Sequence, residues 1–333
     1  MLNQQFSKQF ESWFNDRFGG RHYFLLLHNK VEQILSFGKI ENEKGFLGKD
    51  KWLFFKGDHS VELFQNKLLY SNAQMELIRS NLLKQKQYLT HHHADYYIFI
   101  APNKADVYGE FYKPGIHKVN SEDRIQLLKN YLEANKTPIP VIYPLQDLMD
   151  HKSKGLVYKV TDTHWSEAGA YIGYLSLMKE IQKKHPEIFI LSPSTMDKKQ
   201  VTHPRDGLTK AMAVDDMHWY DDVIYYKPVP QKGFHFKTIV EKKTKNDYNS
   251  IIRTKNPLRK GKVFIFRDSF TTYMLPFISE SFGEVVYLWS HDLNKIENRK
   301  LMDKEKPDIV IHEMVSRWSD RLLQEPTNWK EGK

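Results

Sequence analysis

A serine lies where a buried β-strand is expected to pass into a helix. Residues 262–266 are apolar, β-branched and aromatic, which is typical of a strand inside a parallel sheet, and residues 270–280 are typical of a helix. Ser269 would then stand at the carboxyl edge of the sheet, with the N–H groups and the dipole of a helix behind it. This is the position in which acyl transfer needs its nucleophile.

An acid and a base occur about a hundred residues earlier, in the segment 161–165. In an extended segment, the side chains of residues two apart point to the same side, so the side chains of Asp162 and His164 would point the same way. Serine needs a base to take its proton, and a carboxylate that holds one imidazole nitrogen presents the other as the acceptor. Ser269, His164 and Asp162 are therefore sufficient for a nucleophile, a base and an orienting group.

Further polar and aromatic residues could complete such a site. The backbone N–H of Ser269 and the side chain of Asn103 are candidates for binding an oxyanion, and Trp165 could wall the site and exclude water. Arg317 follows the last predicted strand and could bind an anionic group. Taken singly, each has a simpler explanation: a serine that caps a helix, an Asp-x-His surface hydrogen bond, or a surface arginine.

Metal and phosphate-loop chemistry finds no support in the sequence. The histidines at 91–93 are adjacent and so do not share a face of a helix, and a solvent-exposed helix end explains them. His312-Glu313 has no second histidine at helical spacing, and the glycines at 45–48 lack the Gly-Lys-Ser/Thr ending of a phosphate loop. The chain has no cysteine, which excludes disulfides and thiolate ligands. We expect neither a metal nor another cofactor.

Composition indicates a folded protein with a basic surface. A chain of 333 residues with 40% hydrophobic and 14% aromatic residues can form one large α/β domain or two modest ones. The net charge of +9 favours anionic surroundings, or reflects a solvated lysine-rich surface. No nucleic-acid-binding signature accompanies it, so nucleic acid is not an expected partner.

No membrane-spanning run or signal peptide is apparent. No apolar segment approaches 18 residues, and the amino terminus is polar from its start. These observations fit a cytosolic protein, or a domain that follows an upstream anchor. An apolar stripe with helical spacing within residues 4–37 is expected to pack on the fold, with contact to a membrane surface as the alternative.

The remaining pattern predicts a hairpin over 45–57 and then alternating helices and strands. The expected helices cover 72–90, 122–135, 166–183 and 270–280, and the expected strands cover 95–101, 139–143, 262–266, 284–288 and 308–312. Such alternation is typical of a parallel sheet covered by helices. Right-handed crossovers would bring the loops at 102–104, 161–165 and 267–269 to one rim. Residues 190–260 look irregular, and are long enough for a lid or a substrate-facing insertion.

Four blocks of sequence, in order along nearly the whole chain, carry a resemblance. They are 14–21, 48–54, 101–104 with Tyr108, and the pair formed by 162–165 and 267–270. The set resembles the SGNH-like O-acetyltransferases of the alginate acetylation type, including the related group named for its Asp-His-His-Trp motif. Arg267 stands where esterases usually carry a glycine before Asp-Ser, so it joins Asn103, Trp165 and Arg317 among the oxyanion or substrate-binding candidates.

The resemblance implies an SGNH-like parallel sheet flanked by helices. Residues 1–60 would form a helical segment and a hairpin packed on the core, and 61–333 a catalytic domain with an insertion at about 190–260, before the nucleophile strand. It also implies a triad of Ser269, His164 and Asp162. Family members typically lie outside the cytoplasmic membrane behind an amino-terminal anchor, which would here precede Met1, and work beside a membrane-bound acyltransferase that supplies acetyl groups.

The sequence therefore leads to three hypotheses. The first is an extracytoplasmic O-acetyltransferase that moves an acetyl group through a serine acetyl-enzyme onto hydroxyls of a cell-envelope or secreted polysaccharide. The second is a carbohydrate acetylesterase, in which water takes the place of the sugar. The third is a non-catalytic polysaccharide-binding subunit of an export or acetylation complex, whose Ser269 and His164 would lie far apart.

Overall fold

The computed structural model describes residues 40–202, 207–212, 214, 224–242, 250–290 and 293–325, with three isolated helical positions at 23, 27 and 31. Apart from those positions, the helical stripe predicted within 4–37 lies outside the described residues, as does the block at 14–21. Within the described ranges, no helix combines the length and the apolar character that crossing a membrane requires.

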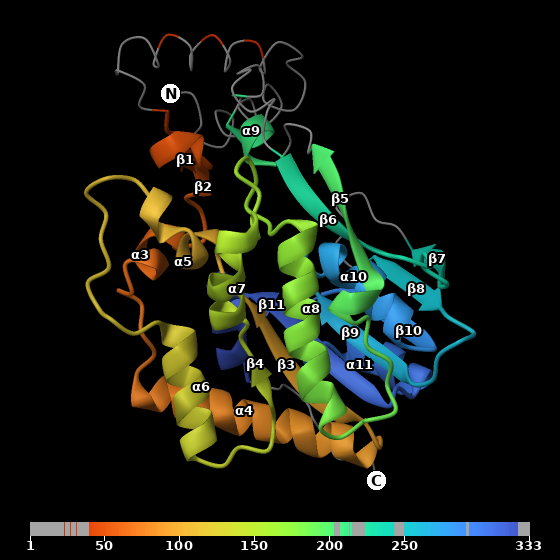
Figure 1. The fold of residues 1–333 in the computed structure, drawn as a ribbon. Helices are drawn as coiled ribbons and strands as arrows, with labels where there is room; N and C mark the ends of the chain where they lie inside the picture. Colours follow the sequence, from red (N-terminus) through yellow and green to blue (C-terminus); the bar gives the residue numbers. More distant parts are fainter. Residues whose placement is uncertain are drawn as a thin grey trace, which may run out of the picture.

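A seven-stranded sheet forms the centre of an α/β fold (Figure 1). Its strand order is β4-β3-β11-β9-β10-β8-β7, and the first five strands are parallel. Those five are β4 (Val141–Ile142), β3 (Asp95–Ala101), β11 (Ile309–Val315), β9 (Lys262–Arg267) and β10 (Glu284–Trp289). Each lies within a few residues of its predicted range, because a strand buried on both faces is a continuous apolar run in the sequence.

The prediction of an irregular segment over 190–260 is wrong for much of its described part. β8 (Ile251–Lys255) and β7 (Lys237–Lys242) extend the sheet, with β8 antiparallel to both of its neighbours. β5 (Met196–Thr202) and β6 (Ile224–Pro230) form a separate antiparallel pair. These strands are partly exposed and rich in lysine, so they lack the apolar run by which the central strands are recognised.

Helices cover both faces of the sheet, and each face has its own core (Figure 1). On one face lie α8 (Glu167–Gln182) and α10 (Thr271–Ser281), and on the other α4 (Asn72–His91), α6 (Arg124–Ala134) and α11 (Ile296–Glu305). The alternation of β9 shows the division, since Val263 and Ile265 belong to the first core and Phe264 and Phe266 to the second. Shorter helices are α3 (Ser60–Phe64), α5 (Lys104–Val107), α7 (Leu145–His151) and α9 (Leu208–Ala211).

The predicted hairpin is present and packs on the first core. β1 (Gly45–Leu47) and β2 (Leu53–Phe55) pair antiparallel, and the 3-10 turn η1 (Lys49–Lys51) joins them. The aromatic side chains of this hairpin are buried in the same cluster as Trp165 and the α8–α10 side of the sheet. The N–H of Leu53 donates to the carbonyl of Val160 at 3.0 Å. The hairpin therefore touches the loop that carries the predicted base.

Helix α8 begins immediately after that loop and is closely fitted to it. Ser166 caps the helix by accepting from the N–H of Gly169, as its position predicts. A Cβ on Gly169 would overlap the carbonyl oxygen of Val157 and touch Trp165 at 3.0 Å. Only glycine allows the helix to approach the loop this closely.

We predict that Gly169→Ala destabilises the protein by about 1–3 kcal/mol, because the added methyl group forces α8 away from Val157, outweighing the better helix propensity of alanine. Chemical denaturation measures this. Lys179→Ala, at an exposed position of the same helix, serves as the control and should change stability by less than about 0.5 kcal/mol. A Gly169→Ala variant as stable as the wild type would contradict the close fit.

Candidate active site

Ser269, His164 and Asp162 form a continuous chain of hydrogen bonds. Nε2 of His164 lies 2.7 Å from Oγ of Ser269, across 105 residues of sequence, and Nδ1 of His164 lies 3.1 Å from Oδ1 of Asp162. Ser269 and His164 are partly exposed, whereas Asp162 is buried. Solvent therefore reaches part of Ser269 and His164, and the carboxylate is withdrawn from solvent behind the imidazole.

The loop that carries Asp162 and His164 is a tight turn, so the prediction of an extended segment is wrong. A bridge between Tyr158 and Trp165 closes the loop, and the N–H of Lys159 donates to the carbonyl of His164 at 3.1 Å. Within the turn, the N–H of Thr163 donates to Oδ1 of Asp162. The two catalytic-type side chains converge because the backbone bends between them.

Asp162 is held in its ionised form. Burial by itself would raise the pKa of Asp162, but the hydrogen bond and charge of His164, the nearby Lys159 and the N–H of Thr163 act against burial. Together they hold the pKa of Asp162 well below its usual range. An ionised acceptor on Nδ1 keeps the proton there and leaves Nε2 as the base toward Ser269.

The turn that carries Ser269 is fixed by two buried carboxyl groups. Oδ1 of Asp268 accepts from the N–H of Phe270 at 2.7 Å, and Oδ2 accepts from the N–H of Val315 at 2.8 Å. In return, Oε2 of Glu313 accepts from the N–H of Asp268 at 2.8 Å. These bonds replace the ladder where β9 and β11 no longer pair, because their last paired residues are Phe266 and His312.

The surroundings of Glu313 disfavour a negative charge on its carboxyl group. Burial is the main cause that raises the pKa of Glu313 well above its usual range, and the adjacent charge of Asp268 acts in the same direction. Sequence reasoning considered Glu313 only as part of a metal motif and so missed this role. An acidic residue at the end of an apolar strand was the available signal.

Trp165 binds the two loops to each other. Its Nε1 donates to the carbonyl of Phe270 at 3.0 Å, and the two rings meet edge to face at 5.3 Å. The indole is fully buried. Trp165 therefore holds the loop of the base against the turn of the nucleophile, from the interior of the fold.

Asn103 and Arg317 meet beside the triad. Nη1 of Arg317 donates to Oδ1 of Asn103 at 3.2 Å, and the guanidinium lies 5.7 Å from the ring of Phe270. Both residues line a small pocket together with Thr163. Thr163 belongs to the loop 159–164 that carries Asp162 and His164, which we call the catalytic loop because of the role proposed for it below. A guanidinium only donates hydrogen bonds, so it fixes the amide oxygen of Asn103 toward itself. The amide NH₂ has two N–H groups, so it can donate to a ligand as well as to the Asp106 carboxyl group.

Arg267 is engaged within the fold. Its Nη1 donates to the carbonyl of Asp268 at 3.1 Å and to Oγ1 of Thr272 at 3.0 Å, and its guanidinium lies over the ring of Trp289. These contacts brace the nucleophile turn from the side of β10.

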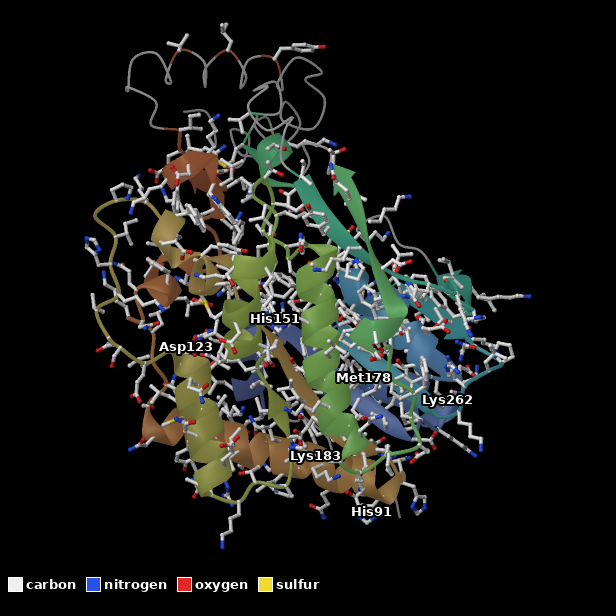
Figure 2. The ribbon with its side chains drawn as sticks, in the orientation of Figure 1. His91, Asp123, His151, Met178, Lys183 and Lys262 are labelled. Atoms are coloured by element: carbon white, nitrogen blue, oxygen red, sulfur yellow. The ribbon has the colours of Figure 1, made fainter. Side chains whose placement is uncertain are left out.

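The described residues contain no group of three histidine, aspartate or glutamate side chains that could hold a metal ion. His91 lies at the end of the molecule opposite the hairpin β1–β2 (Figures 1 and 2). The carboxyl-terminal end of α8, marked by Lys183, lies at the same end of the molecule in Figure 2. The candidate site therefore consists of the triad, the carboxyl pair beneath it and the Asn103–Arg317 pocket.

The chain is similar to known proteins in sequence and in fold. The family described as SGNH hydrolase-like domain, acetyltransferase AlgX, matches residues 46–246. Among solved structures, PatB1 of Bacillus cereus with a sulfonyl adduct is 16% identical, with a TM-score of 0.58 over 86% of this chain and 99% of that one. A DHHW family protein of Eubacterium siraeum is 14% identical, with a TM-score of 0.56 over 86% of this chain and 94% of that one.

The O-acetyltransferase domain of Pseudomonas putida AlgJ is also similar. It is 14% identical, with a TM-score of 0.50 over 87% of this chain and 96% of that one. Comparison with curated proteins gives no match. At these identities the solved structures establish a shared fold, and the family match establishes the SGNH-like class.

We predict that Asp162→Asn destabilises the protein by about 1–3 kcal/mol at neutral pH, because it removes a buried charge-assisted hydrogen bond to His164. The lowered pKa in the folded state means that this stabilisation is complete above the ordinary aspartate value of about 4 and is lost as pH falls below it. Denaturation from pH 7 to pH 3 should show the difference from wild type shrinking toward acid pH. Asp150→Asn, at an exposed carboxylate, should show almost no difference at any pH, and a constant Asp162→Asn difference would refute the assignment.

Proposed function

Because this chain belongs to the family of SGNH hydrolase-like acetyltransferase domains described for AlgX, we propose that it is a serine-dependent O-acetyltransferase with Ser269 as its nucleophile. The observation that carries the proposal is the 2.7 Å contact between Nε2 of His164 and Oγ of Ser269. A non-catalytic subunit has no need of a nucleophile, a base and an ionised acid in hydrogen-bond contact. The assembled triad therefore favours catalysis over the binding-subunit hypothesis.

The first half of the reaction forms an acetyl-enzyme. Nε2 of His164 takes the proton of Ser269 as Oγ attacks the carbonyl carbon of the acetyl donor, and the carbonyl oxygen becomes an oxyanion. The N–H of Ser269 and the amide NH₂ of Asn103 would donate to that oxyanion. As the intermediate collapses, His164 gives its proton to the departing alcohol, and Asp162 stabilises the imidazolium throughout.

The second half transfers the acetyl group to a sugar. His164 takes the proton of a sugar hydroxyl group, whose oxygen attacks the acetyl carbon and forms a second tetrahedral intermediate. Collapse of that intermediate releases the acetylated sugar, and Oγ of Ser269 regains its proton from His164. Water in place of the sugar would give acetate, which is the esterase alternative.

The proposed setting is outside the cytoplasmic membrane, with a cell-envelope or secreted polysaccharide as acceptor. A membrane-bound O-acyltransferase would supply the acetyl group, and an amino-terminal anchor would hold the protein at the membrane. The similarity to the AlgX family and the net charge of +9, which would attract an anionic polymer, support this setting.

Incubation with p-nitrophenyl acetate should add the mass of one acetyl group to the wild-type protein and none to Ser269→Ala. Because removing the nucleophile or the base costs about a thousandfold or more, ester turnover by Ser269→Ala and His164→Ala should fall accordingly. A sulfonyl fluoride should label Ser269, in keeping with the sulfonyl adduct of PatB1. Ser153→Ala, at an exposed serine, serves as the control; a Ser269→Ala variant that is still acetylated and active refutes the proposal. The same reaction with an acceptor oligosaccharide present distinguishes the two enzyme classes. A transferase forms acetylated oligosaccharide, whereas an esterase releases only acetate.

We predict that Asn103→Ala lowers kcat by about 10²–10³-fold with KM changed by less than about threefold, because an oxyanion donor acts mainly in the transition state. Asn103→Asp should lose as much, since a carboxylate cannot donate to the oxyanion. Steady-state kinetics on the same ester measures both. Equal kcat in Asn103→Ala and wild type would assign the oxyanion to other donors.

A further inference from the structure

A buried lysine that the reaction does not use lies directly behind the catalytic loop. Lys104 begins α5, immediately after β3, and is only 4% exposed. Its hydrogen bonds all go to backbone carbonyl oxygens, and these belong to one short stretch of chain. Nζ lies 3.0 Å from the carbonyl oxygen of Lys159, 3.2 Å from that of Val160 and 2.6 Å from that of Asp162.

The donors and the acceptors match in number. An ammonium group has three N–H donors, and three carbonyl oxygens of the loop converge on it. Burial lowers the pKa of Lys104 to about 7, while the charge of Asp162 acts in the opposite direction. The three carbonyl oxygens also favour the ammonium form, because a neutral amine has only two N–H groups to offer.

The hairpin closes the other side of this site. The ammonium nitrogen lies 5.5 Å from the ring of Trp52 and 5.0 Å from the ring of Phe54, within the range of cation–π attraction. Between these two residues, the N–H of Leu53 donates to the same Val160 carbonyl that Lys104 contacts. One cation therefore joins the hairpin, the start of α5 and the catalytic loop.

The loop has a geometric need for this cation. Three buried carbonyl groups that point toward one place repel one another, and a buried carbonyl left without a donor costs about 1–3 kcal/mol. Without Lys104 the Val160 carbonyl would keep the N–H of Leu53, but the carbonyls of Lys159 and Asp162 would lose this donor, and their peptide groups would rotate to find other partners. Such rotation would move the Asp162 side chain, whose own carbonyl makes the shortest of the three bonds.

We propose that Lys104 is a positioning residue for catalysis: its ammonium fixes the backbone of residues 159–162 so that the Asp162 carboxylate meets Nδ1 of His164. Through Trp52 and Phe54 it also makes the orientation of the triad depend on the packing of the hairpin. This inference rests on the proposed function, since it assigns to Lys104 the alignment of the triad that performs the reaction.

The test is Lys104→Met, which keeps the length and the apolar contacts of the side chain and removes its three donors. We expect kcat for p-nitrophenyl acetate to fall by about 10²-fold with KM within about threefold, because a misaligned base affects the chemical step. In the proton spectrum, the low-field signal of the His164 N–H that Asp162 accepts should shift or broaden. If Lys104 only stabilised the fold, kcat per folded molecule and the position of the His164 signal would stay as in the wild type.

The matched control is Lys152→Met. Lys152 also donates to a backbone carbonyl, that of Val107 at 2.8 Å, and also lies near an aromatic ring, that of Tyr108. Its other hydrogen bond goes to the Glu110 carboxylate and not to a carbonyl of the catalytic loop. We expect wild-type kcat and an unchanged His164 signal for this variant.

A folded Lys104→Met protein with kcat within twofold of wild type overturns the inference. If that variant does not fold, the wild-type protein decides: the ¹⁵N-lysine spectrum should contain a slowly exchanging Nζ signal that is absent when Lys104 is replaced by arginine. The buried Lys159, whose Nζ donates to the Tyr273 hydroxyl group, would give a separate signal that remains in that variant. If no slowly exchanging signal is lost on replacement of Lys104 by arginine, the inference is overturned. Ser269→Ala separates failure of the proposed function from failure of the role of Lys104. Activity in Ser269→Ala refutes the proposed function. An inactive Ser269→Ala together with a fully active Lys104→Met refutes only the role of Lys104.

Discussion

The hydrogen bond between His164 and Ser269 is the contact that the surrounding structure has to hold in place. It joins two loops that are 105 residues apart, and neither loop belongs to a regular element that would hold it by itself. One loop ends a strand of the central sheet, and the other precedes a helix that packs on the sheet. A contact of 2.7 Å survives only where both loops are fixed from several sides, because a shift of about 1 Å in a reacting group can cost about two orders of magnitude in rate.

Polar groups inside the protein supply that fixation. The Ser269 turn is held by Asp268 and Glu313, which accept backbone N–H groups across the ends of β9 and β11. The His164 loop is held by Lys104, which donates to backbone carbonyls, and Trp165 joins the two through one further bond. Carboxyl groups thus satisfy the donors of one loop, and an ammonium satisfies the acceptors of the other. Burial of these groups costs free energy, and their hydrogen bonds offset that cost while fixing one conformation.

The fold is shared with solved structures of very different sequence. Identities of 14–16% at TM-scores of 0.50–0.58 mean that most residues differ over the matched chains. Two helical layers on a mostly parallel sheet tolerate such exchange as long as volume and patterning are kept.

The sequence by itself determined the parallel strands, the helices that follow them and the position of Ser269 at a strand-to-helix junction, because apolar periodicity and helix caps are local properties of the chain. It also pointed to Asp162 and His164, although it placed them on an extended segment. The tertiary structure alone decided the bend that brings those two together, the sheet strands within 190–260, and the roles of Lys104 and Glu313. The physical reason is that a buried charge is stabilised by groups from distant parts of the chain, and only the folded structure brings those groups within hydrogen-bonding distance.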